Sequence, residues 1–454
     1  MAFVRSYDTA VIGGGASGSS VLLALAQIAG PAYRAVLFEP LAPGPGIAYG
    51  AQPESLLMNG PARAMSIVPG DDGHLMRWLG NEPAHALISR KRYGEYVRQT
   101  MSAAFASTPS LTHRAAEIVD MESRDGGYRL TDRLGCEYFA SSVVLALGNF
   151  APADDFLPAE VRGHRGYCGN PWQIDVNAMH GDVAIVGSRL TAMDVAAQLD
   201  EKGFAGTIHM ISRHGILPTM ENSRIVGLDS ASLALNARSP RALVRSMRLA
   251  VREHVARGGD WRSVVESIRP IASAIWVSWP LAEQQRFLRH LQPVWAACRY
   301  RVPVATYAAY QNLAQRGILR LIRGRITGAR PSGENTLRMV ISRPGDSTAI
   351  DVSTIVNATG PNANYATIGH PLVRNAMRRG LIRADDLRLG LDVTPELNCI
   401  SQNGSPQPRL FTIGPALRGR FYETTAIPEI RAHAQHIAGA LVALEVGATL
   451  GAVS

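Results

Sequence analysis

The apolar positions of this chain gather in short runs that end in glycine and are followed by helical patterns. Residues 10–12 (AVI) form the first run, and the apolar positions of residues 21–26 follow with helical spacing. Residues 182–187 (DVAIVG) repeat the pattern, with a second helical stretch beginning at residue 188. Continuous apolar runs are typical of strands buried on both faces of a parallel sheet, and helices connect such strands. The pattern therefore predicts an α/β fold with two βαβ units.

Further strands and helices fill the chain around these two units. We expect strands over residues 36–38, 115–121, 128–130, 137–140, 142–147, 208–211, 351–357 and 409–414, and helices over residues 93–105 and 433–444. Residues 217–315 instead show helical periodicity over a stretch longer than a βαβ connection needs. We interpret this stretch as a helical insertion, at about residues 219–315, of the kind that closes over substrates.

These elements predict two domains. Residues 1–170 and 345–454 would form the first, discontinuous domain, and residues 171–344 would form the second domain with its insertion. The length of 454 residues suits two or three domains.

Glycines at the end of the first strand make the first unit chemically specific. Gly13, Gly15 and Gly18 form G-x-G-x-x-G between strand and helix, and Glu39 ends the next strand about twenty residues later. Gly13 permits the tight turn, Gly15 lets a pyrophosphate approach the backbone, and Gly18 permits close packing of helix and strand. Glu39 would accept hydrogen bonds from ribose hydroxyls. The unit is predicted to bind a dinucleotide.

The second unit departs from this pattern at one position. The expected G-x-G-x-x-A reads Gly187-Ser188-Arg189-Leu190-Thr191-Ala192, with arginine in place of the middle glycine. The guanidinium of Arg189 could pair with a phosphate, or its side chain could narrow the approach to the backbone. Ser212 and Arg213 end the next strand without an acid, which favours a 2′-phosphate and hence NADPH over NADH.

Composition narrows the classes of function. The chain is 46% hydrophobic and 18% charged, as expected of a globular enzyme. Residues 236–325 contain sixteen arginines and four acidic residues, so the net positive charge of this segment exceeds the net charge of +9 of the whole chain. We interpret the arginine stripe of residues 241–252 as the solvated face of an amphipathic helix. Alternatively, these arginines attract an anionic cofactor or substrate, or they bind nucleic acid or a membrane. Nothing else in the sequence resembles a nucleic-acid motif.

The four cysteines are far apart and form no C-x-x-C, so neither a redox disulfide nor a metal site is expected. We expect no transmembrane helix and no signal peptide, and therefore a cytoplasmic protein.

Several motifs together resemble a known family. Gly46–Tyr49 (GIAY), residues 56–62 (LLMNGPA), 187–194 (GSRLTAMD), 212–218 (SRHGILP) and 413–431 (IGPALRGRFYETTAIPEIR) are similar to motifs of bacterial FAD/NAD(P)-binding proteins. The strand ends LALGN (145–149), NATG (357–360) and FTIG (411–414) resemble the wider group of two-dinucleotide-binding-domain flavoproteins, which includes flavin-containing monooxygenases and lysine or ornithine N-hydroxylases. The departures are Arg189 and Gly60, and the second affects local packing.

The resemblance implies two Rossmann-like domains, with FAD in the first and NADPH in the second. Segment 44–79 would cross the flavin, unless it is a structural Ω-loop. By this analogy the cofactor-binding residues are Gly13, Gly15, Ser17, Gly18, Glu39, Asn59, Ala62, Met65, Gly148, Asn149, Gly187, Arg189, Thr191, Ser212, Arg213, Gly414, Thr425 and Ile427. Asn59 and Ser66 are the candidate catalytic residues.

The leading function is an NADPH-dependent flavin monooxygenase. It would use molecular oxygen and a flavin C4a-peroxide to hydroxylate a small nucleophilic substrate, for example an amine. The alternatives are an FAD-dependent dehydrogenase or oxidase without oxygenation, and a flavin-binding sensor or accessory protein without turnover.

Overall fold

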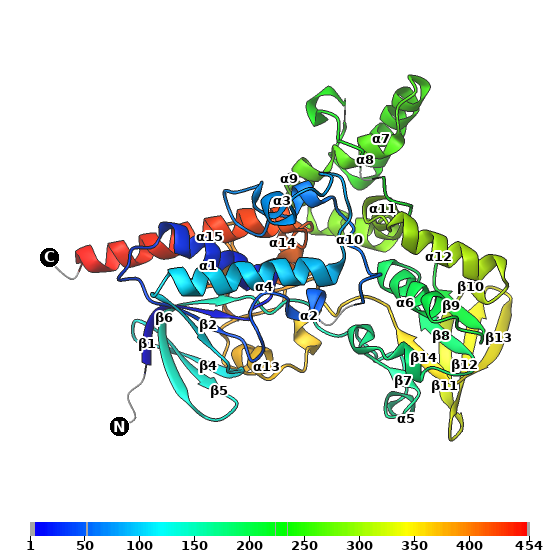
Figure 1. Cartoon of the computed structure of the whole chain (residues 1–454), viewed down its shortest axis with the longest axis horizontal. Helices are drawn as coiled ribbons and strands as arrows, with labels where there is room; N and C mark the ends of the chain where they lie inside the picture. Colours follow the sequence, from blue (N-terminus) through cyan, green and yellow to red (C-terminus); the bar gives the residue numbers. More distant parts are fainter. Residues whose placement is uncertain (1–4, 51–52, 223, 234, 452–454) are drawn as a thin grey trace.

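The computed structural model describes residues 5–50, 53–222, 224–233 and 235–451. It consists of two α/β domains and a helical insertion, as expected from the sequence (Figure 1).

The first domain is built on an eight-stranded sheet. Its path runs β15-β16-β6-β1-β2-β3, with β5 pairing antiparallel to the first half of β6 and β4 pairing to β5. The strands are β1 (Arg5–Ile12), β2 (Ala35–Phe38), β3 (Leu111–Arg114), β4 (Ile118–Arg124), β5 (Gly127–Asp132), β6 (Glu137–Leu145), β15 (Asn398–Ile400) and β16 (Pro406–Thr412). Strands β16, β6, β1, β2 and β3 are parallel to their neighbours.

Three long helices cover this sheet. Figure 1 shows α1, α4 and α15 side by side over one face, and α1 packs against both of the others. The helices of the domain are α1 (Ala16–Ile28), α2 (Gly46–Tyr49), α3 (His74–Leu79), α4 (Arg90–Ser107), α13 (Pro371–Arg378), α14 (Arg418–Phe421) and α15 (Ile427–Gly451). Residues 10–12 of β1, 35–38 of β2 and 143–145 of β6 are buried and apolar, which is what the unbroken apolar runs predict.

The second domain has a five-stranded parallel sheet of order β10-β9-β8-β14-β7. Its strands are β7 (Tyr167–Cys168), β8 (Val183–Val186), β9 (Ile208–Ser212), β10 (Leu319–Arg323) and β14 (Thr354–Asn357). Alternate residues of β8 face different layers. Val183 and Ile185 pack with the helices α6 (Leu190–Glu201) and α12 (Val304–Gln315). Ala184 and Val186 pack with a three-stranded antiparallel sheet, β11 (Arg325–Gly333), β12 (Thr336–Arg343) and β13 (Asp346–Val352). The short helix α5 (Ala159–Arg162) packs against β11.

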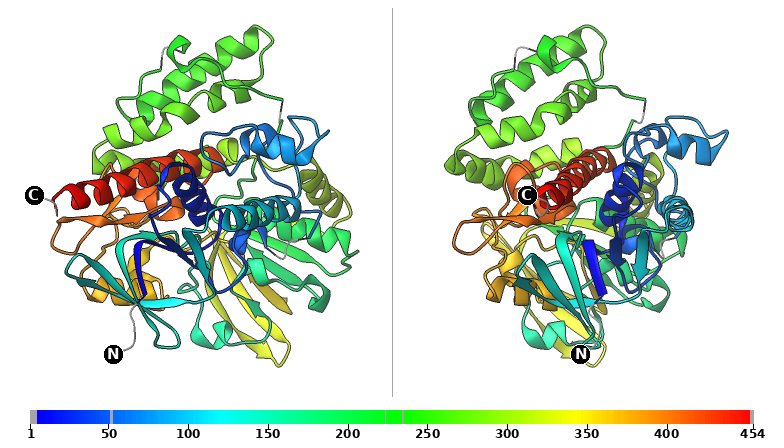
Figure 2. Two further views of the ribbon diagram at one scale, coloured as in Figure 1. Left: turned by 60° about the vertical axis from the view of Figure 1, so that its left-hand side comes forward. Right: turned by 90° about the vertical axis from the view of Figure 1, so that its left-hand side faces the viewer.

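The insertion lies between β9 and α12. Its helices are α7 (Pro240–Ala256), α8 (Trp261–Glu266), α9 (Ala272–Ser278), α10 (Leu281–His290) and α11 (Gln292–Arg299). Figure 2 shows these helices lying over the C-terminal helix α15. Trp276 and Trp279 are buried in a small core with Phe287, which accounts for two of the tryptophans of this stretch. Tyr422 enters the same core from the first domain, and Arg269 pairs with Glu429 at the start of α15 (2.8 and 2.9 Å).

The structure differs from the sequence expectations in three places. Residues 137–140 and 142–147 were expected as separate strands, but β6 is continuous, because it pairs with β5 along its first half and with β1 along its length. The three-stranded sheet was expected only at residues 351–352, although Leu337, Met339 and Ile341 alternate as a half-buried strand should. β7 and β14 pair with each other in the second sheet, so this sheet includes strands that lie on both sides of residues 171–344 in the sequence.

The arginine stripe of α7 is exposed to solvent. Arg241, Arg245, Arg248 and Arg252 line a groove between α7 and α10 together with Arg286 and His290. None of the helices in the described part of the chain is long and apolar enough to cross a membrane.

A buried ion pair joins the two domains. Arg90 at the start of α4 donates to Asp194 on α6 at 2.7 Å, and their side chains are 13% and 9% exposed. Burial raises the pKa of the Asp194 carboxyl, and the Arg90 guanidinium partly offsets this rise.

We therefore predict that Arg90→Met lowers the free energy of unfolding by about 3 kcal/mol at neutral pH, because it leaves a buried carboxylate without its partner. The folded-state pKa of Asp194 would then lie above its unfolded value. The folded state would gain protons as the pH falls, so the deficit should shrink at about pH 5. Urea unfolding at both pH values measures the free energy of unfolding. In the control variant Arg90→Met/Asp194→Leu, which has no unpaired buried carboxylate, most of the lost free energy of unfolding should be regained. An equal deficit at both pH values would contradict the account.

Candidate functional site

The first glycine turn closes on the neighbouring strand of the sheet. Gly13 has φ +102°, and a Cβ built on it would lie 2.3 Å from the carbonyl oxygen of Ala146, just beyond β6. A Cβ on Gly18 would lie 2.0 Å from the carbonyl oxygen of Gly13. Both positions therefore need glycine for the packing of the turn itself, with or without a ligand.

Gly15 is different, because the space beside it is open to a ligand. It has φ −71° as the N-cap of α1, and a Cβ there would meet Gly46 Cα at an ordinary 3.6 Å. The first turn of α1 has no side-chain cap and no acidic residue. Its N–H groups and partial positive charge are therefore available to an anion such as a pyrophosphate.

Glu39 lies beside this turn at the end of β2. One carboxylate oxygen accepts from the Gly14 amide at 2.8 Å, and the other accepts from the Leu41 amide at 3.1 Å. The carboxylate is thus held against the glycine turn, where the ribose of a dinucleotide lies in this type of unit. The glycine turn, the uncapped helix and the acid together fit the adenosine diphosphate part of FAD.

The second unit repeats the packing of the first. Gly187 has φ +127°, and a Cβ on it would lie 2.3 Å from the carbonyl oxygen of Ala358, just beyond β14. Arg189 is the N-cap of α6, with φ −106°. Because this conformation is open to any residue, arginine at this position leaves the turn intact. Its guanidinium donates to the carbonyl oxygen of Pro293 at 3.3 Å, and burial lowers its pKa.

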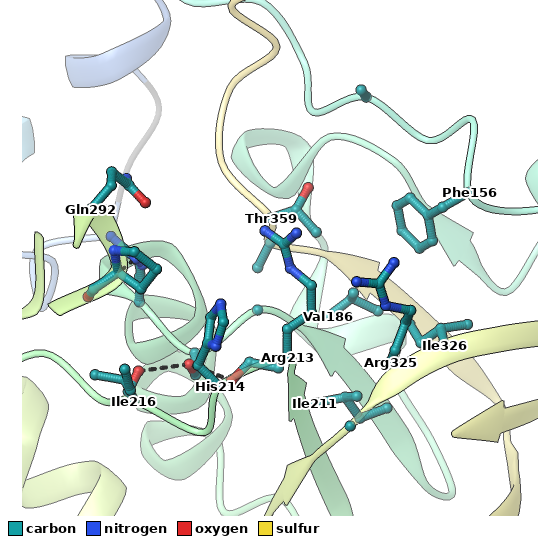
Figure 3. Close-up of a pocket in the computed structure, with 18 of the residues that line it drawn as sticks. Phe156, Val186, Ile211, Arg213, His214, Ile216, Gln292, Arg325, Ile326 and Thr359 are labelled. Carbon is teal, nitrogen blue, oxygen red and sulfur yellow. Dashed lines mark hydrogen bonds between the residues drawn. The ribbon is translucent and has the colours of Figure 1, made fainter. Parts of the chain in front are cut away.

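A pocket of about 450 Å³ opens at the end of this second sheet. Ser212 and Arg213 at the end of β9 line it, as do Arg325 at the start of β11 and Asp155. Figure 3 shows the guanidinium groups of Arg213 and Arg325 extending to the same side of the sheet, into the pocket. The partial burial of His214 and the positive charges of Arg213, Arg189 and Arg323 lower the pKa of its imidazole. The pocket therefore has a positive wall suited to a phosphate group.

A second cavity of about 500 Å³ lies between the two domains and the insertion. Predicted residues from five parts of the chain meet at its wall: Asn59, Gly148, Asn149, Arg189, Thr191, Arg213 and Thr425. Arg189, Arg213, Gln292, Ala358 and Thr359 line both cavities, so the two are adjacent. The insertion contributes Gln292, Ala296 and Tyr300 to the wall.

The remaining predicted residues lie outside these two walls. Ala62, Met65 and Ile427 are buried, and Gly414 packs against the Ser17 side chain near the start of α1. The hydroxyl of Ser66 is fully buried in its own turn, where it donates to the carbonyl oxygen of Asp71. A Cβ on Gly60 would lie 2.3 Å from Cε of Met65, the flexible end of that side chain, so a larger residue here would need only a shift of Met65.

Sequence reasoning missed several residues of the interdomain cavity. Tyr300, Tyr365, Arg418 and Tyr422 line it. The last two lie within the motif 413–431, so its density of charged and aromatic residues was the available signal. Arg325 of the nucleotide pocket had no local signal, because its strand belongs to the sheet that was largely missed.

Comparison with known proteins agrees with this geometry. Residues 10–150 match a family model described as FAD-NAD(P)-binding. No curated protein sequence matches the chain. The chain has the fold of the two-dinucleotide-binding-domain flavoproteins. This confirms the predicted fold class and the expectation of FAD and a nicotinamide nucleotide as cofactors.

Solved structures cover nearly the whole chain. A cadaverine monooxygenase from Erwinia amylovora, solved with FAD, is 15% identical, with a TM-score of 0.67 over 96% of this chain and 94% of its own. An ornithine N-hydroxylase from Kutzneria sp. 744, solved with reduced FAD, NADP+ and L-ornithine, is 13% identical, with a TM-score of 0.64 over 97% and 100%. A thioredoxin reductase from T. acidophilum is 12% identical, with a TM-score of 0.54 over 97% and 99%. Identities this low establish the shared fold.

The two kinds of glycine in the first turn lead to a matched prediction. Gly15→Ala should fold normally but lose FAD by tenfold or more, because the added methyl group occupies the place where the backbone meets the pyrophosphate. Gly13→Ala should instead lower the thermal stability of the protein, because its Cβ collides with the Ala146 carbonyl. Flavin absorbance per protein and thermal unfolding measure the two effects. Gly30→Ala, where a Cβ meets nothing within 4 Å, is the control. Full FAD occupancy in Gly15→Ala would overturn the assignment of this turn.

Proposed function

We propose that this protein is an FAD-dependent monooxygenase that uses NADPH and molecular oxygen to hydroxylate a small nucleophilic substrate, for example an amine. The observation that carries the proposal is the interdomain cavity, which shares five wall residues with the second nucleotide pocket. A nucleotide bound in that pocket can therefore reach the residues that also line the interdomain cavity, where we place the substrate.

FAD would be held by the first domain. Gly13, Gly15, Ser17, Gly18 and Glu39 would contact its adenosine diphosphate part. Asn59, Ala62, Met65, Gly148, Asn149, Gly414, Thr425 and Ile427 remain our proposed contacts for the rest of the molecule. When bound, this cofactor supplies electron transfer from NADPH and activation of oxygen.

NADPH would be held by the second domain. Arg213 and Arg325 line the pocket from neighbouring elements, and no ion-pair partner for either is found among the described residues. Two unpaired guanidinium groups suit the 2′-phosphate that distinguishes NADPH from NADH. Arg189, at the start of α6, would pair with the pyrophosphate through its guanidinium, at a position where glycine would let the backbone approach the phosphate directly.

The balanced reaction is the oxidation of NADPH with one oxygen atom transferred to the substrate. NADPH, a proton, oxygen and an amine R-NH₂ give NADP+, R-NHOH and water. The chain contributes binding, orientation and shielding from solvent. Tyr300, Tyr365 and Tyr422 enclose the cavity with aromatic rings, and Asn59 and Asn149 provide amide groups at its wall. Asn59 is the candidate catalytic residue that faces this space.

The second candidate is an FAD-dependent dehydrogenase or oxidase, since a thioredoxin reductase also shares the fold. Reduction of a protein disulfide needs a pair of thiols that can exchange. Cys136, Cys168, Cys298 and Cys399 are far apart in the sequence and form no C-x-x-C pair, and Cys399 is buried. This favours oxygen chemistry over thiol chemistry, while oxidation of a small substrate without oxygenation remains the alternative.

The decisive experiment is steady-state turnover of the purified holoenzyme with NADPH, oxygen and a panel of small amines. A monooxygenase is expected to form hydroxylamine in about one-to-one ratio with NADPH consumed, and labelled oxygen should appear in the product. Flavin reduction by an amine without NADPH would instead identify the dehydrogenase. Absence of reduction by either would point to a binding protein without turnover.

Nucleotide preference gives a separate prediction. Arg213→Gln should weaken NADPH binding by about 10-fold to 100-fold and leave NADH binding unchanged, because only the 2′-phosphate loses a charge-assisted hydrogen bond. Anaerobic flavin reduction at several nucleotide concentrations measures both affinities. Arg323→Gln, at the end of β10 and outside the pocket wall, is the matched control. Equal losses for NADPH and NADH would show that Arg213 does not recognise the 2′-phosphate.

A further inference from the structure

The wall of the interdomain cavity is positively charged and contains no acid. Among the described residues, its lining includes Arg189, Arg213 and Arg418 but no aspartate or glutamate. A substrate with two ammonium groups would meet these arginines without any carboxylate to neutralise it. Both kinds of substrate occur in enzymes of this fold, since the structures compared above include a cadaverine monooxygenase and an ornithine N-hydroxylase. The fold alone therefore does not choose between them.

Arg418 is the arginine of this wall that the nucleotide pocket does not share. Arg189 and Arg213 line both cavities. Arg418, the first residue of α14, lines the interdomain cavity but not the nucleotide pocket. Its guanidinium carbon lies 5.2 Å from the centre of the Tyr422 ring. Its acidic neighbour Glu423 forms its ion pair with Arg299 instead (3.4 Å). Glu423 and Tyr422 lie near enough to raise the pKa of Arg418, but no ion pair to Arg418 is found among the described residues, so its guanidinium remains able to pair with a carboxylate of a ligand.

Two buried hydroxyl groups lie on the same wall, and that of Tyr422 is next to the Arg418 side chain. The side chains of Tyr365 and Tyr422 belong to residues that are 2% and 5% exposed, and neither hydroxyl makes a hydrogen bond of standard geometry. A buried hydroxyl without a partner costs free energy, so such groups mark places where a ligand or water is expected. Burial raises the pKa of both phenols, which therefore remain hydrogen-bond donors at neutral pH.

The backbone at Tyr422 is strained, which supports a functional role. This residue has φ +60° and ψ −53°, a conformation that costs free energy for any residue with a side chain. The core of the insertion holds it there, because its ring packs against Trp276 and Phe287 (4.8 and 5.4 Å between ring centres). The insertion therefore fixes the position of the hydroxyl beside Arg418.

We propose that the cavity recognises a carboxylate on the substrate, with Arg418 as the charged partner and Tyr422 as a hydrogen-bond donor. The substrate class is then an amine that also carries a carboxylate, such as an amino acid, and not a diamine. The excess of arginines in residues 236–325, sixteen against four acids, would also attract an anionic substrate to the molecule. The amine part of this substrate class rests on the proposed monooxygenase activity. The carboxylate site rests only on the residues of the cavity wall.

The test compares amines that differ by one carboxylate. Lysine and cadaverine form one such pair, and ornithine and putrescine form another. With the NADPH-loaded holoenzyme, kcat/KM should be at least about tenfold higher for the amino acid of a pair. Arg418→Gln should remove this preference by lowering kcat/KM for the amino acid about 10-fold to 100-fold, mostly through KM. It should not lower kcat/KM for the diamine, because it removes a positive charge that repels a dication.

A second measurement does not depend on turnover. Benzoate, titrated into the oxidised holoenzyme, should bind and perturb the flavin absorbance, and Arg418→Gln should weaken this binding by the same factor. Arg420→Gln, in the same helix but outside the cavity wall, is the matched control. FAD content and the rate of flavin reduction by NADPH should be unchanged in both variants.

The outcomes separate the two proposals. A preference for diamines, or benzoate binding that does not depend on Arg418, would overturn the carboxylate site while leaving a monooxygenase. Arg418-dependent benzoate binding without hydroxylation of any amine would retain the site and reject the monooxygenase. A loss of NADPH affinity in Arg418→Gln would assign the arginine to the nucleotide and overturn the proposal.

Discussion

The structure depends on one close contact that occurs in each domain. At the end of β1 and of β8, a glycine backbone lies so near an alanine carbonyl of the neighbouring strand that a Cβ would approach it to 2.3 Å. Gly13 and Ala146 form this contact in the first domain, and Gly187 and Ala358 form it in the second. The contact closes the turn and directs the following helix N-terminus toward a ligand. Both nucleotide sites are consequences of it.

The substrate space depends on how three parts of the chain are held together. The Arg90–Asp194 pair joins the domains, and the insertion is anchored to the first domain by Tyr422 and by Arg269 with Glu429. Each anchor is buried or half-buried, where removal of one charged partner costs more than it does at the surface. The residues of the cavity wall are therefore held in fixed positions, so the cavity can bind one substrate in preference to another.

Charge gives this wall its chemical character. Arginines with no ion-pair partner among the described residues line the nucleotide pocket, and Arg418 lines the neighbouring cavity. A positive wall binds the phosphates of a nucleotide and disfavours a dication, so a single electrostatic property links the proposed preference for NADPH with the proposed carboxylate on the substrate. The same property gives a reason for arginine at position 189, because a guanidinium can bind a phosphate that its side chain keeps away from the backbone.

The sequence by itself determined the features whose cause is local. Strand, glycine turn, helix and terminal acid follow one another within residues 7–39, so the fold class and the tight turn at Gly13 could be predicted. Only the tertiary structure decided the rest. Continuous β6 and the sheet β11–β13 depend on pairing between distant strands, and Ser66 turned out to have its hydroxyl engaged in its own turn. Arg418 and Tyr422 meet the other domain only because the insertion packs around Tyr422. No local pattern carries that information, since contacts between segments hundreds of residues apart depend on the packing of the whole molecule.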